Sequence, residues 1–101
     1  KTLAVQLGRF GITVNCIHPG VTRTERTPRL LASRGKEMGI DAADVEKGDF
    51  AHDSPRGNAI GRMVDASEIG YVTAFLASDK AWAISGELIV ASGGAGRSVF
   101  Y

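Results

Sequence analysis

The sequence has little that would point to a membrane, a disulfide framework or a nucleic-acid partner. It holds one cysteine in 101 residues, which excludes an internal disulfide and suits a reducing compartment. No apolar run approaches the roughly 20 residues of a membrane span, and the start does not resemble a signal peptide. The formal net charge is +1, with Lys and Arg scattered, so no basic surface for nucleic acid is expected. These absences predict a soluble, cytoplasmic protein that binds neither membrane nor nucleic acid.

Metal-binding and hydrolytic sites are not indicated by the residues that would have to form them. His52 has no second ligand at a metal-binding spacing, so no metal site is expected. Cys16 falls within a predicted strand and is expected to be a small core residue. His18 comes at the end of that strand, where a local hydrogen bond is favoured over a substrate contact. The acids Asp41, Asp44, Glu46 and Asp49 are expected to form one face of a helix rather than a hydrolytic pair.

What the sequence does contain is a pattern of buried strands and amphipathic helices. An opening helix is expected to run to about Arg9 and to end at Gly11. Residues 12–18 carry apolar groups on both faces, which is typical of a covered parallel strand, and the run breaks at a Pro-Gly pair. Residues 87–91 form a second apolar run. Because helices separate the two strands, a parallel pair is predicted.

The segment 25–58 differs in composition from the rest, since it is richer in charge and in small residues. Two short helices are expected in it, one capped by Thr27 and one capped by Asp41. The second helix has a thin apolar face. The segment is therefore predicted to be a mobile lid, attached to the body mainly by the pair Leu30-Leu31.

A further helix is expected after the lid-like segment, because Asp65 and Glu68 have the spacing of a capping box. The apolar stripe of this helix is expected to be buried and consists of Ile69, Val72, Phe75 and Leu76.

The predicted core is small for an independent domain, because two buried strands and one well-patterned helix bury a limited area. The sequence also does not begin with Met, and its first helix begins without a capping residue. We therefore interpret residues 1–101 as the carboxy-terminal portion of one larger domain, whose amino-terminal half is not in this chain.

Several short motifs occur in a characteristic order along the chain. Gly11 to Asn15 is followed by Pro19-Gly20 with Thr24, a Pro-Gly-x-x-x-Thr pattern. Gly61-Arg62, Glu68-Ile69, Phe75 to Asp79, Ser85-Gly86 and Gly93-Gly94 follow. Together these motifs resemble the last third of a short-chain dehydrogenase/reductase, a family of nicotinamide-dependent oxidoreductases. The resemblance implies an α/β fold: the carboxy-terminal part of a doubly wound parallel, Rossmann-type sheet, with two parallel strands, helices and a helical substrate lid.

The resemblance also implies that NAD or NADP binds at the turn after the first strand. It places Pro19, Gly20, Val21, Thr22 and Thr24 against the cofactor, with the Thr22 amide on the nicotinamide carboxamide and the Thr24 hydroxyl beside it. From the residues alone, the two threonines are instead expected to cap the following helix. The resemblance reverses that preference.

No catalytic residue is expected in this chain. The family's catalytic Ser, Tyr and Lys are expected upstream, because Tyr71 is followed by Phe75 where a Tyr-x-x-x-Lys pair needs lysine, and Tyr101 is terminal. Arg23, Arg26 and Arg29 could meet an anionic substrate, although a solvated, salt-bridging role is favoured.

The resemblance therefore implies that the intact protein interconverts a small-molecule carbonyl and an alcohol by hydride transfer, as a homo-oligomer (dimer or tetramer). The 101-residue chain alone is predicted to be inactive. The alternative is a truncated paralogue or fragment that acts as a non-catalytic oligomerisation or interaction module, a use that the apolar residues 99–101 would fit.

Overall fold

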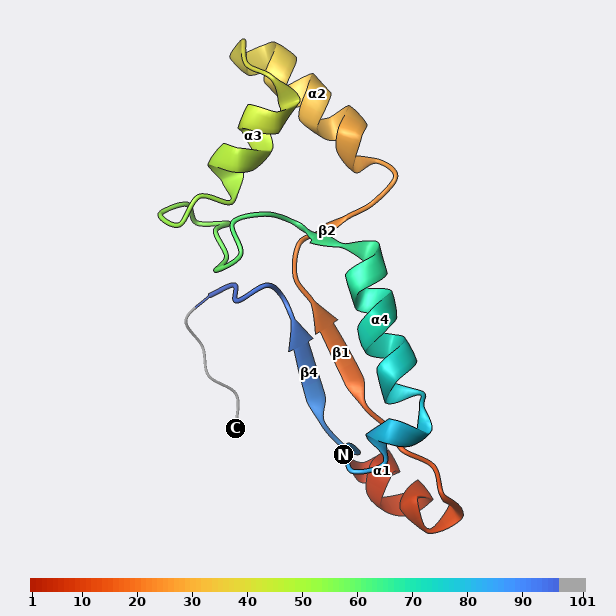
Figure 1. Cartoon of the computed structure of the whole chain (residues 1–101). Coiled ribbons are helices and arrows are strands. Elements are labelled where there is room, and N and C mark those ends of the chain that lie inside the picture. Colours follow the sequence, from red (N-terminus) through yellow and green to blue (C-terminus); the bar gives the residue numbers. More distant parts are fainter. Residues whose placement is uncertain (97–101) are drawn as a thin grey trace.

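Parallel strands and helices make up the chain, so the architecture is α/β (Figure 1). The computed structural model describes residues 1–96; the predicted apolar contact at residues 99–101 lies outside them. In chain order the elements are α1 (Thr2–Leu7), the 3-10 turn η1 (Gly8–Phe10), β1 (Cys16–Pro19), β2 (Thr22–Arg23), α2 (Thr27–Met38), α3 (Ala42–Asp49), β3 (Val64–Asp65), α4 (Ala66–Leu76), the 3-10 turn η2 (Asp79–Ala81) and β4 (Leu88–Ala91).

The strands form two small parallel pairs. β1 pairs with β4, with Cys16 opposite Leu88 and Pro19 opposite Ala91, as predicted. β2 pairs with β3 over two residues each, a pairing that the sequence did not indicate. β1 begins four residues later than the predicted strand, because residues 12–15 form no ladder with β4. Instead, the Val14 N–H donates to the Ser85 hydroxyl (3.2 Å), and the Asn15 side chain donates to the Ile84 carbonyl (3.0 Å).

The opening helix follows its prediction closely. α1 ends at Leu7 and continues as η1 to Phe10. Gly11 then ends the turn with a left-handed backbone (φ +73°), a conformation that glycine adopts without a steric penalty.

The helices α2 and α3 lie side by side, away from the β1–β4 pair (Figure 1). Between them lies the main buried cluster of the described residues, formed by Leu31, Val45, Phe50 and Met63. Leu31 is 5% exposed and Leu30 is 60% exposed, so within residues 1–96 only Leu31 of the predicted pair is buried. The reason is that α3 and Phe50 pack against only one side of α2.

The start of α2 also differs from the prediction, and the helix is longer than the short one expected. The helix runs on to Met38, where Gly39 ends it with φ +72°. Thr27 is the first helical residue rather than the cap, and Arg26 occupies the cap position. Asp41 occupies the predicted N-cap position of α3, but in the described residues its side chain accepts no hydrogen bond from the α3 amides.

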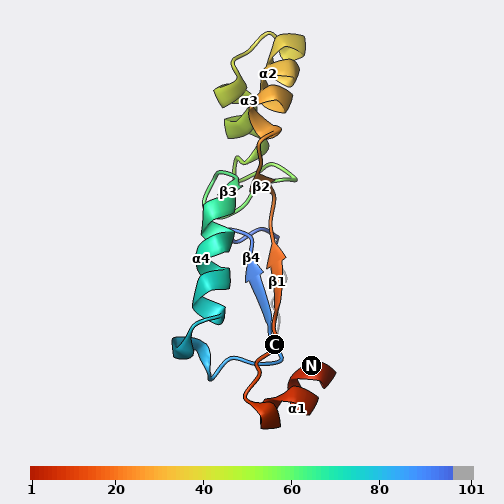
Figure 2. The same ribbon diagram turned by 90° about the vertical axis from the view of Figure 1, so that its right-hand side faces the viewer.

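The helix α4 begins at the predicted capping box. The Asp65 N–H donates to Glu68 Oε1 (2.9 Å), which satisfies an amide at the helix start. Of the predicted buried stripe, Ile69, Val72 and Leu76 are only half-buried and Phe75 is exposed. The helix packs along one face of the β1–β4 pair (Figure 2), so burial comes from one side only.

No described element covers the other face of the β1–β4 pair (Figure 2). Cys16 and Leu88, which lie opposite each other, are both exposed, so the expectation that Cys16 is a core residue is wrong within residues 1–96. The chain measures 58 × 27 × 20 Å. Its accessible surface is 7625 Å², whereas a compact monomer of this mass exposes about 5,500 Å². The apolar strands are thus open to solvent on one side.

Among the helices of the described residues, none has the length and apolar character required to span a bilayer.

Candidate cofactor-contact site

The carboxyl ends of β1 and β4 are held against each other by a glycine. The Gly20 N–H donates to the Ala91 carbonyl (3.1 Å) directly after Pro19. A Cβ atom at Gly20 would lie 2.7 Å from Ser92 Cα, too close for any other residue without a backbone shift. Ligands of open parallel sheets bind beyond these strand ends, so the Gly20–Ser92 contact positions the turn that follows it.

Thr22 is fixed in this turn by its own side chain. Its hydroxyl donates to the Gly20 carbonyl (2.8 Å). On the other side, the Val64 N–H donates to the Val21 carbonyl (3.1 Å). Thr22 lies opposite Val64 in the parallel ladder of β2 and β3. In such a ladder every second residue of a strand bonds to the neighbouring strand. Because Val64 bonds to Val21, the N–H of Thr22 points away from β3. The turn therefore presents the Thr22 amide between two groups that are themselves hydrogen-bonded.

Thr24 is joined to the start of α2 through Thr27. The Thr24 N–H donates to the Thr27 hydroxyl (2.9 Å), and the two hydroxyl oxygens are 3.5 Å apart. Thr27 is buried, whereas Thr24 is exposed. In the described residues, neither the Thr22 nor the Thr24 hydroxyl accepts a hydrogen bond from an α2 amide, although the Thr24 backbone carbonyl accepts one from the Thr27 N–H (3.1 Å). The expectation that they cap the helix is thus not supported, and the Thr24 hydroxyl faces solvent.

Arg23 lies between these two threonines and is ion-paired. Its guanidinium bonds to Glu46 of α3 and lies 3.5 Å from Asp65, the residue that precedes α4. The predicted salt-bridging role is therefore confirmed for Arg23.

The acids of α3 are also used in ion pairs. Asp49 accepts a hydrogen bond from Arg34 of α2 (Nη2 to Oδ1, 3.0 Å), and this bond lowers the pKa of the Asp49 carboxyl. Arg56 lies 3.7 Å from the same carboxylate. The acidic face thus joins α3 to its neighbours, and residues 1–96 hold no group of three metal-ligating side chains.

The two histidines stand outside this arrangement. Both are exposed, and in the part of the chain that the structure describes no side-chain hydrogen bond involves His18. The local bond predicted for His18 is therefore not found there.

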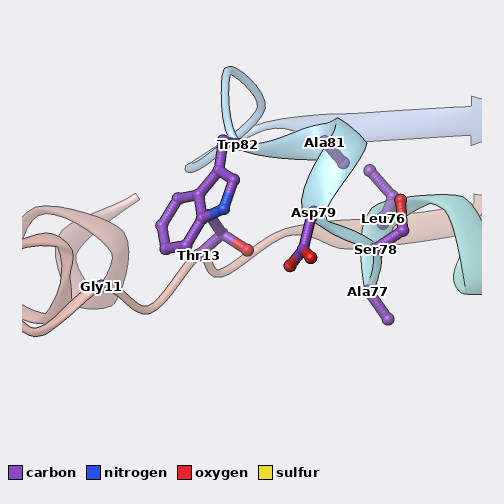
Figure 3. A pocket seen from close by; sticks show the side chains of 8 residues that line it. All are labelled: Gly11, Thr13, Leu76, Ala77, Ser78, Asp79, Ala81 and Trp82. Atoms are coloured by element: carbon purple, nitrogen blue, oxygen red, sulfur yellow. The ribbon is translucent and has the colours of Figure 1, made fainter.

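A small hollow lies at the opposite, amino end of β1 and β4 (Figure 3). Its volume is about 140 Å³, and Trp82, 58% exposed, forms one wall beside Thr13 and Gly11. Because this hollow is remote from the strand ends that hold Gly20 and Thr22, it is not the candidate cofactor site.

Comparison with known proteins decides the family. A family profile described as Enoyl-(Acyl carrier protein) reductase matches residues 1–96, which is nearly the whole chain. The chain belongs to the short-chain dehydrogenase/reductase family. It matches the carboxy-terminal portion of that family.

Individual short-chain dehydrogenase/reductases agree with this assignment. The NADPH-dependent reductase BacG of Bacillus subtilis is 32% identical over 99 residues, which are 98% of this chain and 36% of BacG. A short chain dehydrogenase family protein from Francisella tularensis is 28% identical with a TM-score of 0.70, over 92% of this chain and 36% of that one.

The fold also matches that of a solved L-sorbose reductase. L-sorbose reductase from Gluconobacter frateurii, solved with NADPH and L-sorbose, gives a TM-score of 0.80 at 24% identity, over 97% of this chain and 36% of that one. The chain therefore spans about a third of the length of the short-chain dehydrogenase/reductases that it matches.

Two contributors to the candidate site were missed in the sequence. No role was predicted for Ser92, although it lies directly against Gly20. Thr27 was assigned to a helix cap, although it binds the Thr24 amide. The Thr-x-x-Thr spacing of residues 24 and 27 was the available signal for the second contact.

Proposed function

We propose that this chain forms the carboxy-terminal third of an NAD(P)-dependent oxidoreductase that interconverts a carbonyl and an alcohol. The family assignment, the coverage of about a third of its relatives, and the NADPH bound to or used by two of those relatives support the proposal. The observation that carries it is the turn after β1, where the Thr22 amide and the solvent-exposed Thr24 side chain lie beyond the ends of two parallel strands.

Each residue of the turn has a distinct role in this proposal. Pro19 restricts the backbone at the strand end, and Gly20 allows the approach to Ser92. Val21 continues the backbone beside the cofactor ring. Thr22 donates its amide to the nicotinamide carboxamide, and the Thr24 hydroxyl forms a second bond to the same group. Short side chains suit this role because little conformational freedom is lost when they bind.

The bound nicotinamide supplies or accepts the hydride, and residues outside this chain move the proton. The family's serine, tyrosine and lysine belong to that upstream part, in which the lysine makes the tyrosine a better acid or base. We therefore propose that the full-length protein oxidises NAD(P)H with a carbonyl substrate and that residues 1–101 alone do not. Parallel assays of both proteins test this, and turnover by the isolated chain would contradict it.

The contribution of Thr24 can be measured with an isosteric substitution. Thr24→Val removes the hydroxyl and should weaken cofactor binding by about 1 kcal/mol or somewhat more, the typical loss for one hydrogen bond. Thr73→Val is the matched control, since Thr73 lies on exposed α4 and bonds only to the Ile69 carbonyl (2.9 Å). Unchanged cofactor affinity in Thr24→Val would remove Thr24 from the site.

A non-catalytic interaction module is the alternative function. The observation that favours it is the exposed apolar surface of α4, where Tyr71 and Phe75 project to solvent. In the oxidoreductase proposal the same surface contacts a second subunit of a cytoplasmic homo-oligomer. The coding sequence upstream of Lys1 distinguishes the two: an in-frame glycine-rich loop and Tyr-x-x-x-Lys pair support the enzyme, and their absence supports the module.

A further inference from the structure

Arg23 connects three separate parts of the described chain. It belongs to β2, and its neighbours Thr22 and Thr24 are the two threonines of the proposed cofactor contact. Side chains alternate along a strand, so Arg23 projects to the side opposite the threonines. There it bonds to Glu46 of α3 and lies 3.5 Å from Asp65, which precedes α4. Figure 1 shows β2 at the junction between the α2–α3 pair and α4.

The backbone alone holds this junction weakly. β2 and β3 pair over two residues each, and so short a ladder contributes little stability by itself. Among the ion pairs of residues 1–96, the pair between Arg23 and Glu46 is the one that joins the α2–α3 helices to a strand. The side chains of β2 are therefore the principal polar link between the cofactor turn and the lid-like helices.

The surroundings favour a persistent interaction at this place. The Arg23 and Glu46 side chains are 38% and 18% exposed, so water screens them less than it screens a surface pair. They line a hollow of about 350 Å³ together with Lys47, Arg62 and Asp65. Arg62, the other guanidinium that lines this hollow, is already bound to Glu68 (2.7 Å). Glu46 thus has Arg23 as its partner.

We propose that Arg23 is a positioning residue that couples the placement of α3 to the geometry of the Thr22–Thr24 turn. With the bond to Glu46 formed, α3 is held against β2, and the turn keeps the Thr22 amide and Thr24 hydroxyl in place for the cofactor. When the bond is broken, the helices α2 and α3 move more freely and the turn loses one of its supports. The proposal rests on the cofactor role proposed above for this turn.

A double-mutant cycle in the full-length protein tests the coupling. Arg23→Gln and Glu46→Gln should each raise the KM for NAD(P)H about fivefold with a smaller change in kcat, and the double variant should be no worse than either single one, because both remove the same interaction. Arg23→Lys keeps the charge and should restore much of the affinity. Arg34→Gln is the matched control, since Arg34 pairs with Asp49 within the α2–α3 unit and should leave the KM unchanged.

Hydrogen exchange supplies a readout that does not depend on activity. Glu46→Gln changes only α3, yet it should speed the exchange of the amides of residues 22–24. If the faster exchange is confined to α3, the proposed coupling is wrong. It is also wrong if the effects of the two single variants on the KM add up in the double variant. If the wild-type full-length protein does not oxidise NAD(P)H at all, the proposed function fails, while the exchange result still decides whether Arg23 couples the two segments.

Discussion

The α2–α3 pair and the β1–β4 pair with α4 are built in opposite ways. The helical pair encloses large apolar side chains, among them Phe50, which is 1% exposed. In β1, β4 and α4 the described residues are half-buried or exposed, and Leu88 and Val90 are among the exposed ones. The helical pair thus finds its packing partners within a short stretch of chain.

The difference follows from where the packing partners lie in the sequence. Leu31, Val45 and Phe50 come from neighbouring elements, so they meet when two short helices fold back on each other. The strands β1 and β4 come from opposite ends of the chain, and among residues 1–96 they are covered by α4 alone. A segment that carries charge and little apolar pattern can therefore be better packed locally than the apolar strands that it interrupts.

The largest expected effect is the loss of the helical cluster. Phe50→Ala should destabilise the full-length protein by about 3–5 kcal/mol, because it leaves a cavity beside Leu31 and Val45. Leu30→Ala, at an exposed position of the same helix pair, should change stability by less than about 0.5 kcal/mol. Urea unfolding measures both. Equal losses in the two variants would mean that Leu30 is also packed, against a part of the protein that residues 1–96 do not include.

A smaller effect is expected at the contact that joins the strand ends. Gly20→Ala places a Cβ atom 2.7 Å from Ser92 Cα and should cost about 1–3 kcal/mol of stability, with weaker cofactor binding because the turn shifts. Gly48→Ala in α3 is the control, because no atom lies within 4 Å of its new Cβ, and it should be neutral or stabilising. Thermal unfolding and a cofactor titration report on the two effects separately; a fully stable Gly20→Ala protein with unchanged affinity would contradict the close approach.

Hydrogen exchange compares the two regions directly. In the proposed full-length enzyme without cofactor, we expect the amides of residues 25–58 to exchange faster than those of residues 12–18 and 87–91. The helical cluster rests on four buried side chains, whereas in the full-length protein the strands are covered on both faces. Added cofactor should slow the exchange of residues 25–58. Protection of this segment equal to that of the strands, in the absence of cofactor, would show that it is not a lid.

The smallest effect is a pH dependence of the helical pair. Because the Arg34 hydrogen bond lowers the Asp49 pKa in the folded state, this pair stabilises the protein above the unfolded-state pKa of about 4. The contribution is lost as the pH falls through the lower, folded-state value. Wild-type protein should therefore lose its stability advantage over Asp49→Asn between pH 7 and strongly acidic pH, as urea unfolding at each pH would show. A difference in stability between wild type and Asp49→Asn that stays the same at every pH would show that Asp49 does not cause the pH dependence.

Glu68 of α4 provides the corresponding measurement for the other region. Hydrogen bonds from Arg62 and from the Asp65 amide lower the pKa of Glu68 to about 2. An NMR titration should find this carboxyl still ionised at pH 3. Its stabilising effect should be complete above the unfolded-state pKa of about 4.3 and should be lost progressively as the pH falls from there through about 2.

The sequence predicted those features that depend on neighbouring residues. The capping box of Asp65 and Glu68, the end of the first helix at Gly11 and the placement of Asp41 before α3 are all local, and the structure confirms them. The parallel pairing of β1 and β4 was also predicted, because intervening helices restrict the topology.

Features that depend on distant residues were not predicted. Which of Leu30 and Leu31 is buried depends on where α3 and Phe50 lie, and two adjacent leucines give no signal of that. The β2–β3 ladder is too short to leave a pattern, and the partner of Arg23 is 23 residues away. For the candidate site, the sequence located the turn, but the bonds that hold Thr22 and Thr24 came from the structure.

The two-stranded sheet has a practical consequence for producing this chain. Both β1 and β4 are edge strands within the described residues, and exposed apolar edges invite pairing with strands of other molecules. Expressed by itself, the chain is expected to self-associate. Supplied together with the upstream part of the proposed oxidoreductase, it should instead add its strands to that sheet, so that the two polypeptides behave as complementary halves of a split enzyme whose activity reports their assembly.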